Sequence, residues 1–176
     1  MAPNPTTIFH ITDIANLPSI LENRGLLSYS LMIQNSIGYI NIAHNTIQER
    51  RAKKAVPIHP YGFLHDYVPF YFAPRSPMLY TISRGNVEGY KGGQRSVLHL
   101  YTSAQRISQS GLHYCFTDGH AVIALSNYFR DLQFLDEIDW SVMDSRYWFD
   151  TLESPDRTRT RQAEFLVNNN RPLGTD

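Results

Sequence analysis

The run YVPFYF, residues 67–72, is the most strongly strand-forming stretch of the chain, because aromatic and β-branched side chains favour extended backbone. Pro69 lies in its middle and cannot donate a ladder hydrogen bond, so the strand is expected at a sheet edge or at a bulge. Pro74 and Pro77 then bracket a tight turn, PRSP. We therefore expect a strand that stops abruptly in a turn.

Two more strands are expected at the ends of the chain. Residues 7–12, TIFHIT, are rich in β-branched side chains, and residues 162–167, QAEFLV, form the last such run. Asp13 follows the first strand as a helix N-cap, and the apolar spacing after it predicts a short helix that stops at Gly25.

The same patterns predict the remaining elements. They are helices over residues 42–55, 78–84 and 103–108, strands over residues 97–101 and 112–116, and a mainly helical stretch over residues 120–140. Long strand–helix–strand crossovers are missing from this order, which predicts an α+β fold with mixed or antiparallel strands. The length and the lack of internal repeats indicate one domain over residues 1–176.

Bulk composition excludes several classes of protein. Sixteen basic residues balance sixteen acidic ones, so any attraction to nucleic acid must come from a local patch. Cys115 is the only cysteine, which excludes an intramolecular disulfide and a multi-cysteine zinc site. No run approaches the roughly 20 apolar residues that span a bilayer, and the N-terminus carries no export pattern. We therefore expect a cytoplasmic protein with no membrane association.

Glu164 interrupts an otherwise apolar strand, and alternation places it on the face opposite Ala163 and Phe165. A charged side chain on a half-exposed strand is commonly a solvent-facing residue. His10, in the first strand, is by itself more often a structural histidine than a ligand. Neither position identifies a site without further information.

Arg50 and Arg51 lie near the end of the helix expected over residues 42–55, where cations suit the macrodipole and are usually solvated. An aromatic cluster suits stacking on a base or a nicotinamide ring, but it suits an ordinary core equally well. Its members are Tyr67, Phe70, Tyr71, Phe72 and Tyr80. These features permit a binding site without requiring one.

Two alternative functions stay open on the residues alone. The pair His65–Asp66 is similar to the HD pair of metal-dependent phosphohydrolases, which would need His44 and Asp118 as further ligands, although no motif supports those two roles. The aromatic cluster would also suit a non-catalytic module that binds single-stranded DNA. No Walker loop, GxSxG, HExxH or GxGxxG motif occurs.

Four segments together resemble the DarT family of DNA ADP-ribosyltransferase toxins. They are IFHITDIANLPSIL at residues 8–21, TIQERRAKKAVP at residues 46–57, FLHDYVPFYFAPRSPMLY at residues 63–80 and RQAEFLV at residues 161–167. The resemblance covers essentially the whole chain in the family's order. It implies the ADP-ribosyltransferase fold, a split pair of small mixed or antiparallel sheets with flanking helices around an NAD cleft. It also implies transfer of ADP-ribose from NAD to thymidine bases of single-stranded DNA.

The resemblance assigns catalytic roles to Glu164 and Arg51. The NAD-binding positions that it implies are His10, Thr12, Asn16, Arg51 and Tyr71. A carboxylate such as Glu164 would stabilise the positive charge that develops when the nicotinamide–ribose bond breaks. Arg51 would pair with the diphosphate or steady a deprotonated thymine nitrogen. NAD is expected as a substrate, and no metal is expected.

The irregular segment before Glu164 corresponds to the loop with which these enzymes recognise their target. The residues expected to contact DNA are Lys53, Lys54, Arg75, His120, Tyr147, Trp148, Arg157 and Arg159. The resemblance further implies an antitoxin partner with a macrodomain that removes the modification. Because family members continue beyond the position of Asp176, a trimmed C-terminus is expected.

Overall fold

The computed structural model describes residues 1–168, so the last eight residues of the expected domain, and the expectation of a trimmed C-terminus, lie outside the described residues. One antiparallel sheet of six strands organises the fold, in the order β3-β1-β2-β6-β4-β5. The strands are β1 (Thr7–Asp13), β2 (Tyr67–Tyr71), β3 (Val97–Ser103), β4 (Tyr114–Thr117), β5 (Tyr128–Phe129) and β6 (Glu164–Asn168). This arrangement confirms the predicted α+β class with antiparallel strands.

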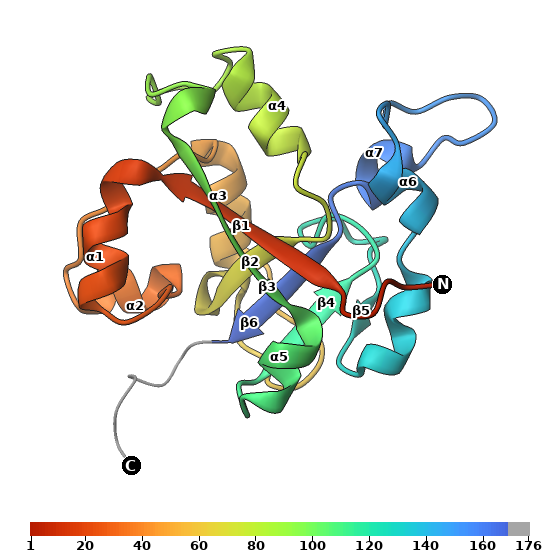
Figure 1. Ribbon diagram of the computed structural model, residues 1–176, viewed down its shortest axis with the longest axis horizontal. Helices are drawn as coiled ribbons and strands as arrows, with labels where there is room; N and C mark the ends of the chain where they lie inside the picture. Colours follow the sequence, from red (N-terminus) through yellow and green to blue (C-terminus); the bar gives the residue numbers. More distant parts are fainter. Residues whose placement is uncertain (169–176) are drawn as a thin grey trace.

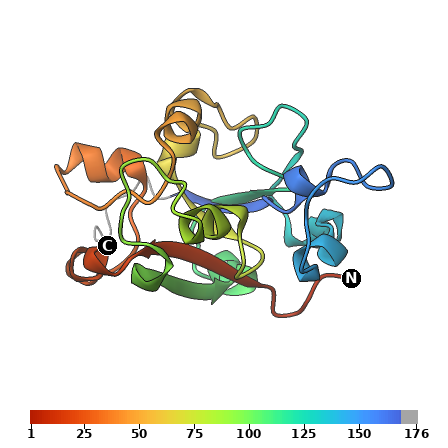
Figure 2. The ribbon, with the colours of Figure 1, turned by 90° about the horizontal axis from the view of Figure 1, so that it is seen from above.

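Short helices flank the sheet. They are α1 (Leu17–Glu22), α2 (Tyr29–Gln34), α3 (Asn45–Lys53), α4 (Pro77–Ser83), α5 (Ala104–Gln109), α6 (Trp140–Asp144) and α7 (Arg157–Thr160). Figures 1 and 2 show α1 and α2 at one end of the sheet and α6 and α7 at the other. The segment between α6 and α7 projects from the body of the molecule (Figure 1).

The strand β2 lies inside the sheet, so the expectation of an edge strand or a bulge at Pro69 was wrong. Pro69 pairs with Leu166 of β6 in regular register. Its carbonyl oxygen accepts a hydrogen bond from the ring of His10, which places the missing N–H on the side of β1. Pairing between β1 and β2 is limited there to Phe9 and Tyr71. A proline is tolerated here because β1 and β2 form almost no backbone ladder on that side of the strand.

The pairing of β1 with β2 also explains why the two small sheets that were expected are joined into one sheet. The strands β1 and β3 pair along their whole length, from Thr7–Ser103 to Asp13–Val97. On the other side, β6 pairs with both β2 and β4. Among the strands of residues 1–168, the two halves pair with each other only through β1 and β2.

The largest core cluster packs around β6 and its neighbours. Phe116 of β4 and Phe165 of β6 are fully buried and stack with their rings 3° from parallel. Phe72 meets both of these rings edge to face. Burial of such large rings is the main source of stability at the centre of the sheet, and it fixes the position of Glu164 next to Phe165.

Several expected element boundaries were wrong for identifiable reasons. The helix expected over residues 42–55 is α3, which ends at Lys53 because Lys54 is extended and Ala55 bridges to Phe63. The stretch expected to be mainly helical over residues 120–140 contains the short β5 and a 3-10 helix at Leu132–Glu137. Its apolar residues pack into the core from turns, which apolar periodicity alone cannot distinguish from a helix.

The other expected elements are present with small shifts. Asp13 caps a 3-10 turn by accepting from the backbone N–H of Ala15, and α1 follows. The helix expected over residues 78–84 is α4, whose cap is Ser76. The helix α2 was not expected. Over residues 1–168, no helix is long and apolar enough to cross a membrane.

Candidate active site

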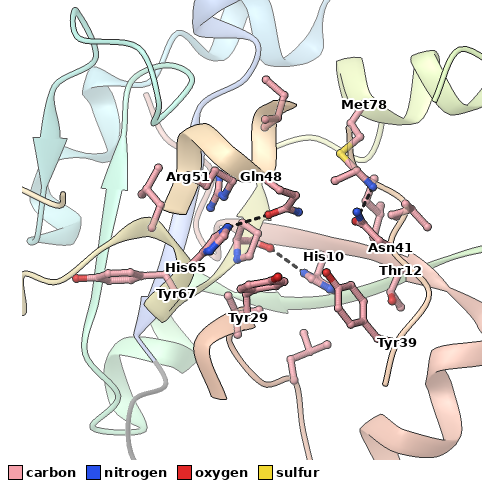
Figure 3. Close-up of a pocket in the computed structure, with 18 of the residues that line it drawn as sticks. His10, Thr12, Tyr29, Tyr39, Asn41, Gln48, Arg51, His65, Tyr67 and Met78 are labelled. Carbon is pink, nitrogen blue, oxygen red and sulfur yellow. Dashed lines mark hydrogen bonds between the residues drawn. The ribbon is translucent and has the colours of Figure 1, made fainter. Parts of the chain in front are cut away.

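A cleft of about 350 Å³ opens between the two halves of the sheet. Its walls come from β1, α3, β2 and α4 and from the start of β6 (Figure 3). All six residues that the sequence analysis assigned to catalysis or NAD line it, namely His10, Thr12, Asn16, Arg51, Tyr71 and Glu164. Residues up to 154 positions apart in the sequence, from His10 to Glu164, thus share one cavity.

Glu164 lies at the inner end of this cleft and is 3% exposed. Its Oε2 accepts a hydrogen bond from Nη1 of Arg51 at 2.6 Å. Its Oε1 accepts from the backbone N–H of Ala121 and lies 3.0 Å from Nδ1 of His120. Glu164 is therefore a buried carboxylate held by three donors, and the solvent-facing alternative is excluded.

The turn after β4 creates part of this environment. The Thr117 hydroxyl donates to the carbonyl of Gly119 at 2.6 Å and accepts from the backbone N–H of Glu164. A side chain at Gly119 would bring its Cβ against Nη1 of Arg159, closer than any packing allows. This tight turn aims the next two residues, His120 and Ala121, at the carboxylate.

Arg51 reaches the carboxylate from the last turn of α3. It is 8% exposed, whereas its neighbour Arg50 is exposed, because adjacent helical positions point about 100° apart. Nη2 of Arg51 is buried and has no hydrogen-bond partner within residues 1–168. Buried donors are normally satisfied, so this nitrogen provides an unused donor in a cavity that a ligand could fill.

The charges of the site favour the ionised carboxylate. Burial alone would raise the pKa of Glu164, but Arg51 and His120 outweigh it and hold the pKa at about 2. Glu164 therefore carries its negative charge at any physiological pH. Burial, followed by the same negative charge, raises the pKa of Tyr71, so its hydroxyl stays protonated.

His10 lies on β1 with its Nδ1 2.8 Å from the carbonyl oxygen of Pro69. Because a carbonyl only accepts, Nδ1 carries the proton. Burial lowers the pKa of His10, which keeps the ring neutral and leaves Nε2 as an acceptor. A sugar hydroxyl is the kind of donor that such a nitrogen would accept from.

Asn16 and Thr12 act together at the far end of the cleft. The Asn16 side chain bonds both backbone groups of Ile40, at 2.7 and 3.0 Å, and also donates to the Thr12 hydroxyl. Its amide thus clamps the loop that carries Tyr39 and Asn41, two further cleft-lining residues. Tyr71 donates its hydroxyl to Sδ of Met78 at 3.5 Å. These contacts shape the cavity before any ligand enters.

Gln48 and His65 form a second polar pair on the wall, which the sequence analysis did not assign to the site. Nε2 of His65 lies 3.1 Å from Oε1 of Gln48, and its ring packs 4.2 Å from that of Tyr29 (Figure 3). Burial, then nearby Arg51, lowers the pKa of His65. The only available signal was that Gln48 precedes Arg51 by one helical turn and therefore shares its face.

The phosphohydrolase alternative finds no support in this geometry. Asp66 accepts from the hydroxyl of Ser30 and from the backbone N–H of Phe63, while Asp118 pairs with Arg159. Nowhere in residues 1–168 do three or more His, Cys, Asp or Glu side chains gather in a way that could hold a metal ion.

The residues expected to contact DNA lie in different environments in the structure. Lys53, Arg75 and Tyr147 are exposed. Lys54 and Trp148 are half-buried, and His120 lies in the cleft beside Glu164.

Arg157 and Arg159 were also expected to contact DNA, but their side chains already bind other groups of the protein. Arg157 donates to the Ser145 hydroxyl and to the carbonyl of Tyr147. Arg159 pairs with Asp118 at 2.9 Å and with Asp156 at 2.7 Å. Both side chains therefore brace the loop of residues 145–156 in the free protein.

Comparison with known proteins relates this chain to a defined family. A sequence model of the family described as "ssDNA thymidine ADP-ribosyltransferase, DarT" matches residues 9–174. A DNA ADP-ribosyl transferase of Thermus sp. strain 2.9 is 47% identical over 165 residues, which is 94% of this chain and 76% of the relative.

Solved structures are similar as well. DarT of Thermus sp. 2.9 in complex with ADP-ribosylated single-stranded DNA matches with a TM-score of 0.89 and 46% identity, over 96% of this chain and 78% of that one. The same protein in complex with NAD+ matches with a TM-score of 0.84 and 43% identity over the same shares. A fusion protein of Thermosipho africanus, which joins a DNA ADP-ribosyl transferase to a DNA ADP-ribosyl glycohydrolase, is 28% identical over 95% of this chain and 40% of its own length.

Proposed function

The chain belongs to the DarT family of single-stranded DNA thymidine ADP-ribosyltransferases, and we propose that its Glu164 and Arg51 catalyse transfer of ADP-ribose from NAD to a thymidine base. The observation that carries these two assignments is the buried ion pair between them, in which one Arg51 nitrogen still lacks a partner within residues 1–168. Buried donors are normally satisfied, so this nitrogen is a donor that a bound substrate could use.

The residues of the cleft suit the donor substrate, NAD. The neutral His10 offers an acceptor to a ribose hydroxyl, and the protonated hydroxyl of Tyr71 lies beside the position proposed for the nicotinamide. Asn16 contributes by holding the loop at Ile40, and Thr12 lies next to it. A preformed cavity of this kind lowers the entropic cost of placing the bond to be broken.

Glu164 supplies the charge that the reaction needs. As the bond between the nicotinamide nitrogen and the ribose carbon breaks, the electron pair leaves with nicotinamide and positive charge grows on the sugar. A fixed carboxylate with a pKa of about 2 is fully ionised and stabilises that charge without reorganisation. Because the charge exists only in the transition state, Glu164 contributes more to rate than to NAD binding.

Arg51 has two partners in this proposal. Nη1 orients Glu164, and the free Nη2 contacts either an oxygen of the diphosphate or the thymine ring. The thymine ring nitrogen releases its proton to solvent and forms the new bond to the ribose carbon from which nicotinamide has departed. An arginine is suited to stabilising that anionic base, because it stays protonated under all physiological conditions.

The biological partners follow from the family. The Thermosipho africanus fusion joins a related transferase to a glycohydrolase in one chain. We propose that this chain is likewise a toxin whose modification is removed by a separate macrodomain antitoxin, and that it acts on DNA in the cytoplasm.

Incubation of the protein with NAD and oligonucleotides, followed by mass spectrometry, tests the function. We expect one ADP-ribose on an oligonucleotide that contains thymidine, and none on a matched oligonucleotide in which every thymidine is replaced by deoxycytidine. The reaction is run in the presence of a chelator, and the product should be unchanged. Cleavage of the oligonucleotide that stops with chelator would instead indicate a phosphohydrolase, and binding without a gain in mass would indicate a non-catalytic module.

A further inference from the structure

Arg161 is a second buried arginine, and it does not contact the catalytic carboxylate. It is 4% exposed and lies in the turn that leads into β6. No carboxylate within residues 1–168 lies at ion-pair distance from it. Burying a cation without such a partner is costly, so other groups must compensate its charge.

Backbone carbonyl groups provide that compensation, and they come from two distant segments. Nη1 of Arg161 donates to the carbonyls of Val142 and Met143 in α6, and Nη2 donates to the carbonyl of Arg75 at 2.7 Å. Carbonyls in the last turn of a helix carry partial negative charge, and that of Val142 also accepts from the backbone N–H of Ser145. Arg161 therefore joins the end of α6 to the turn that precedes α4.

The flat face of the guanidinium supports an aromatic pair. Cζ of Arg161 lies 4.9 Å from the ring centre of Trp148. The Trp148 ring in turn meets the ring of Tyr80 edge to face, at 6.1 Å. Trp148 belongs to the loop of residues 145–156, whereas Tyr80 belongs to α4 and is 54% exposed. The contact thus bridges the projecting loop and a helix that lines the cleft.

The Trp148–Tyr80 pair is linked to the cleft through two segments of the chain. Met78 of α4 and Gln162 both line the cleft, and they are near neighbours in sequence of Tyr80 and Arg161 respectively. Accessible aromatic rings bind single-stranded nucleic acid by stacking on its bases, and here the phenol of Tyr80 is exposed while the indole of Trp148 is half-buried.

We propose that Arg161 is a positioning residue for the DNA acceptor, because it holds Trp148 against Tyr80 as a platform on which a base next to the target thymidine stacks. At 4% exposure Arg161 does not touch DNA itself, and it acts through the two rings. The inference rests on the proposed function, since it assigns the acceptor side of the same site.

Steady-state kinetics with both substrates test the assignment. Arg161→Met removes the charge, and Arg161→Lys keeps the charge but loses the planar fork. We expect either change to raise the KM for a thymidine oligonucleotide about tenfold, while the KM for NAD changes by less than about twofold. Arg106→Met, at an exposed position of α5, is the matched control and should change neither. An equal rise in both KM values, or no rise for the oligonucleotide, would overturn the proposal.

Fluorescence gives a readout that holds even if the Arg161 variants fail to fold. The chain has two tryptophans, so Trp140→Phe leaves Trp148 as the sole tryptophan emitter. We expect saturating oligothymidine to quench its emission and saturating NAD to leave it unchanged. A bound oligonucleotide without quenching would contradict the platform. If the wild type leaves thymidine oligonucleotides unmodified, the proposed function itself fails, whereas a failure of the KM split or of quenching concerns Arg161 and its platform alone.

Discussion

The cleft around Glu164 and the loop of residues 145–156 both depend on arginine, but they use it differently. In the cleft, Arg51 lines the cavity and keeps one buried donor unused by residues 1–168. Beside the loop, at the start of α7, Arg157 and Arg159 use their donors on neighbouring protein atoms.

The two regions also differ in how far their side chains are buried. The strand β6 is buried from Glu164 to Val167, whereas the loop leaves Tyr147 61%, Phe149 63% and Leu152 104% exposed. A fixed polar centre suits catalysis, since the groups need not reorganise during the reaction. A surface of exposed rings suits recognition of an unstacked strand. We therefore propose that the two regions divide chemistry from target recognition, and the predictions below challenge this division.

The largest effect is expected from Glu164→Ala, which removes the charge that stabilises the transition state. Transfer to DNA should fall by a factor on the order of a thousand or more, while NAD affinity stays close to that of the wild type. Single-turnover rates and calorimetric titration measure the two quantities. Cells should tolerate this variant where the wild type is toxic. Activity within about tenfold of the wild type would remove Glu164 from the mechanism.

A somewhat smaller loss is expected from Arg51→Lys, which keeps the charge but cannot contact Glu164 and a substrate at once. We expect transfer to fall about a hundredfold in a steady-state assay. Arg50→Ala is the control, because Arg50 is exposed and points away from the cleft. Equal losses in the two variants would show that helix stability, and not the site, is being measured.

The ion pair also predicts how stability depends on pH. The pKa of Glu164 falls from an ordinary value of 4.5 to about 2 on folding, so its ionisation stabilises the fold above pH 4.5, and this contribution is lost as the pH falls toward 2. The difference in unfolding free energy between the wild type and Glu164→Gln should be constant from pH 5 to pH 7 and should shrink below about pH 4.5. Urea unfolding at several pH values measures it. A difference that changes between pH 5 and pH 7 instead would mean that another group titrates with the fold.

The smallest effects are expected from the basic residues on the surface. Replacing Lys53 and Lys54 by Ala should reduce the slope of log affinity for single-stranded DNA against log salt by roughly 0.7 for each phosphate that is no longer neutralised. Arg157→Ala with Arg159→Ala should weaken DNA binding but change the slope less, because Asp118 and Asp156 already neutralise Arg159. Titrations of a labelled oligonucleotide at several salt concentrations compare the two pairs. A larger slope change for the loop pair would place the phosphate contacts on the loop.

The sequence predicted the elements that local chemistry specifies. The β-branched run before Asp13 and the cap that this residue supplies are both present. Local sequence could not predict that Glu164 is buried. Its burial depends on β2 and on the turn after β4, which pack beside it from elsewhere in the chain.

The remaining misses have the same origin in tertiary structure. Pro69 lies in an interior strand because the His10 ring occupies the position of a ladder partner. The pairing of His65 with Gln48 and the unused donor of Arg51 depend on how α3 docks, which no spacing in the sequence specifies. The resemblance to the family indicated the residues proposed for catalysis, and the structure supplied their geometry.

A structure of the Glu164→Ala protein bound to both NAD and a thymidine oligonucleotide tests the division between cleft and loop most directly. We predict that NAD occupies the cleft, that Nη2 of Arg51 lies within hydrogen-bond distance of a substrate oxygen or of the thymine ring, and that a neighbouring base stacks on Trp148 or Tyr80. A complex in which Nη2 of Arg51 still lacks a partner, or in which the DNA avoids the loop of residues 145–156, would contradict it.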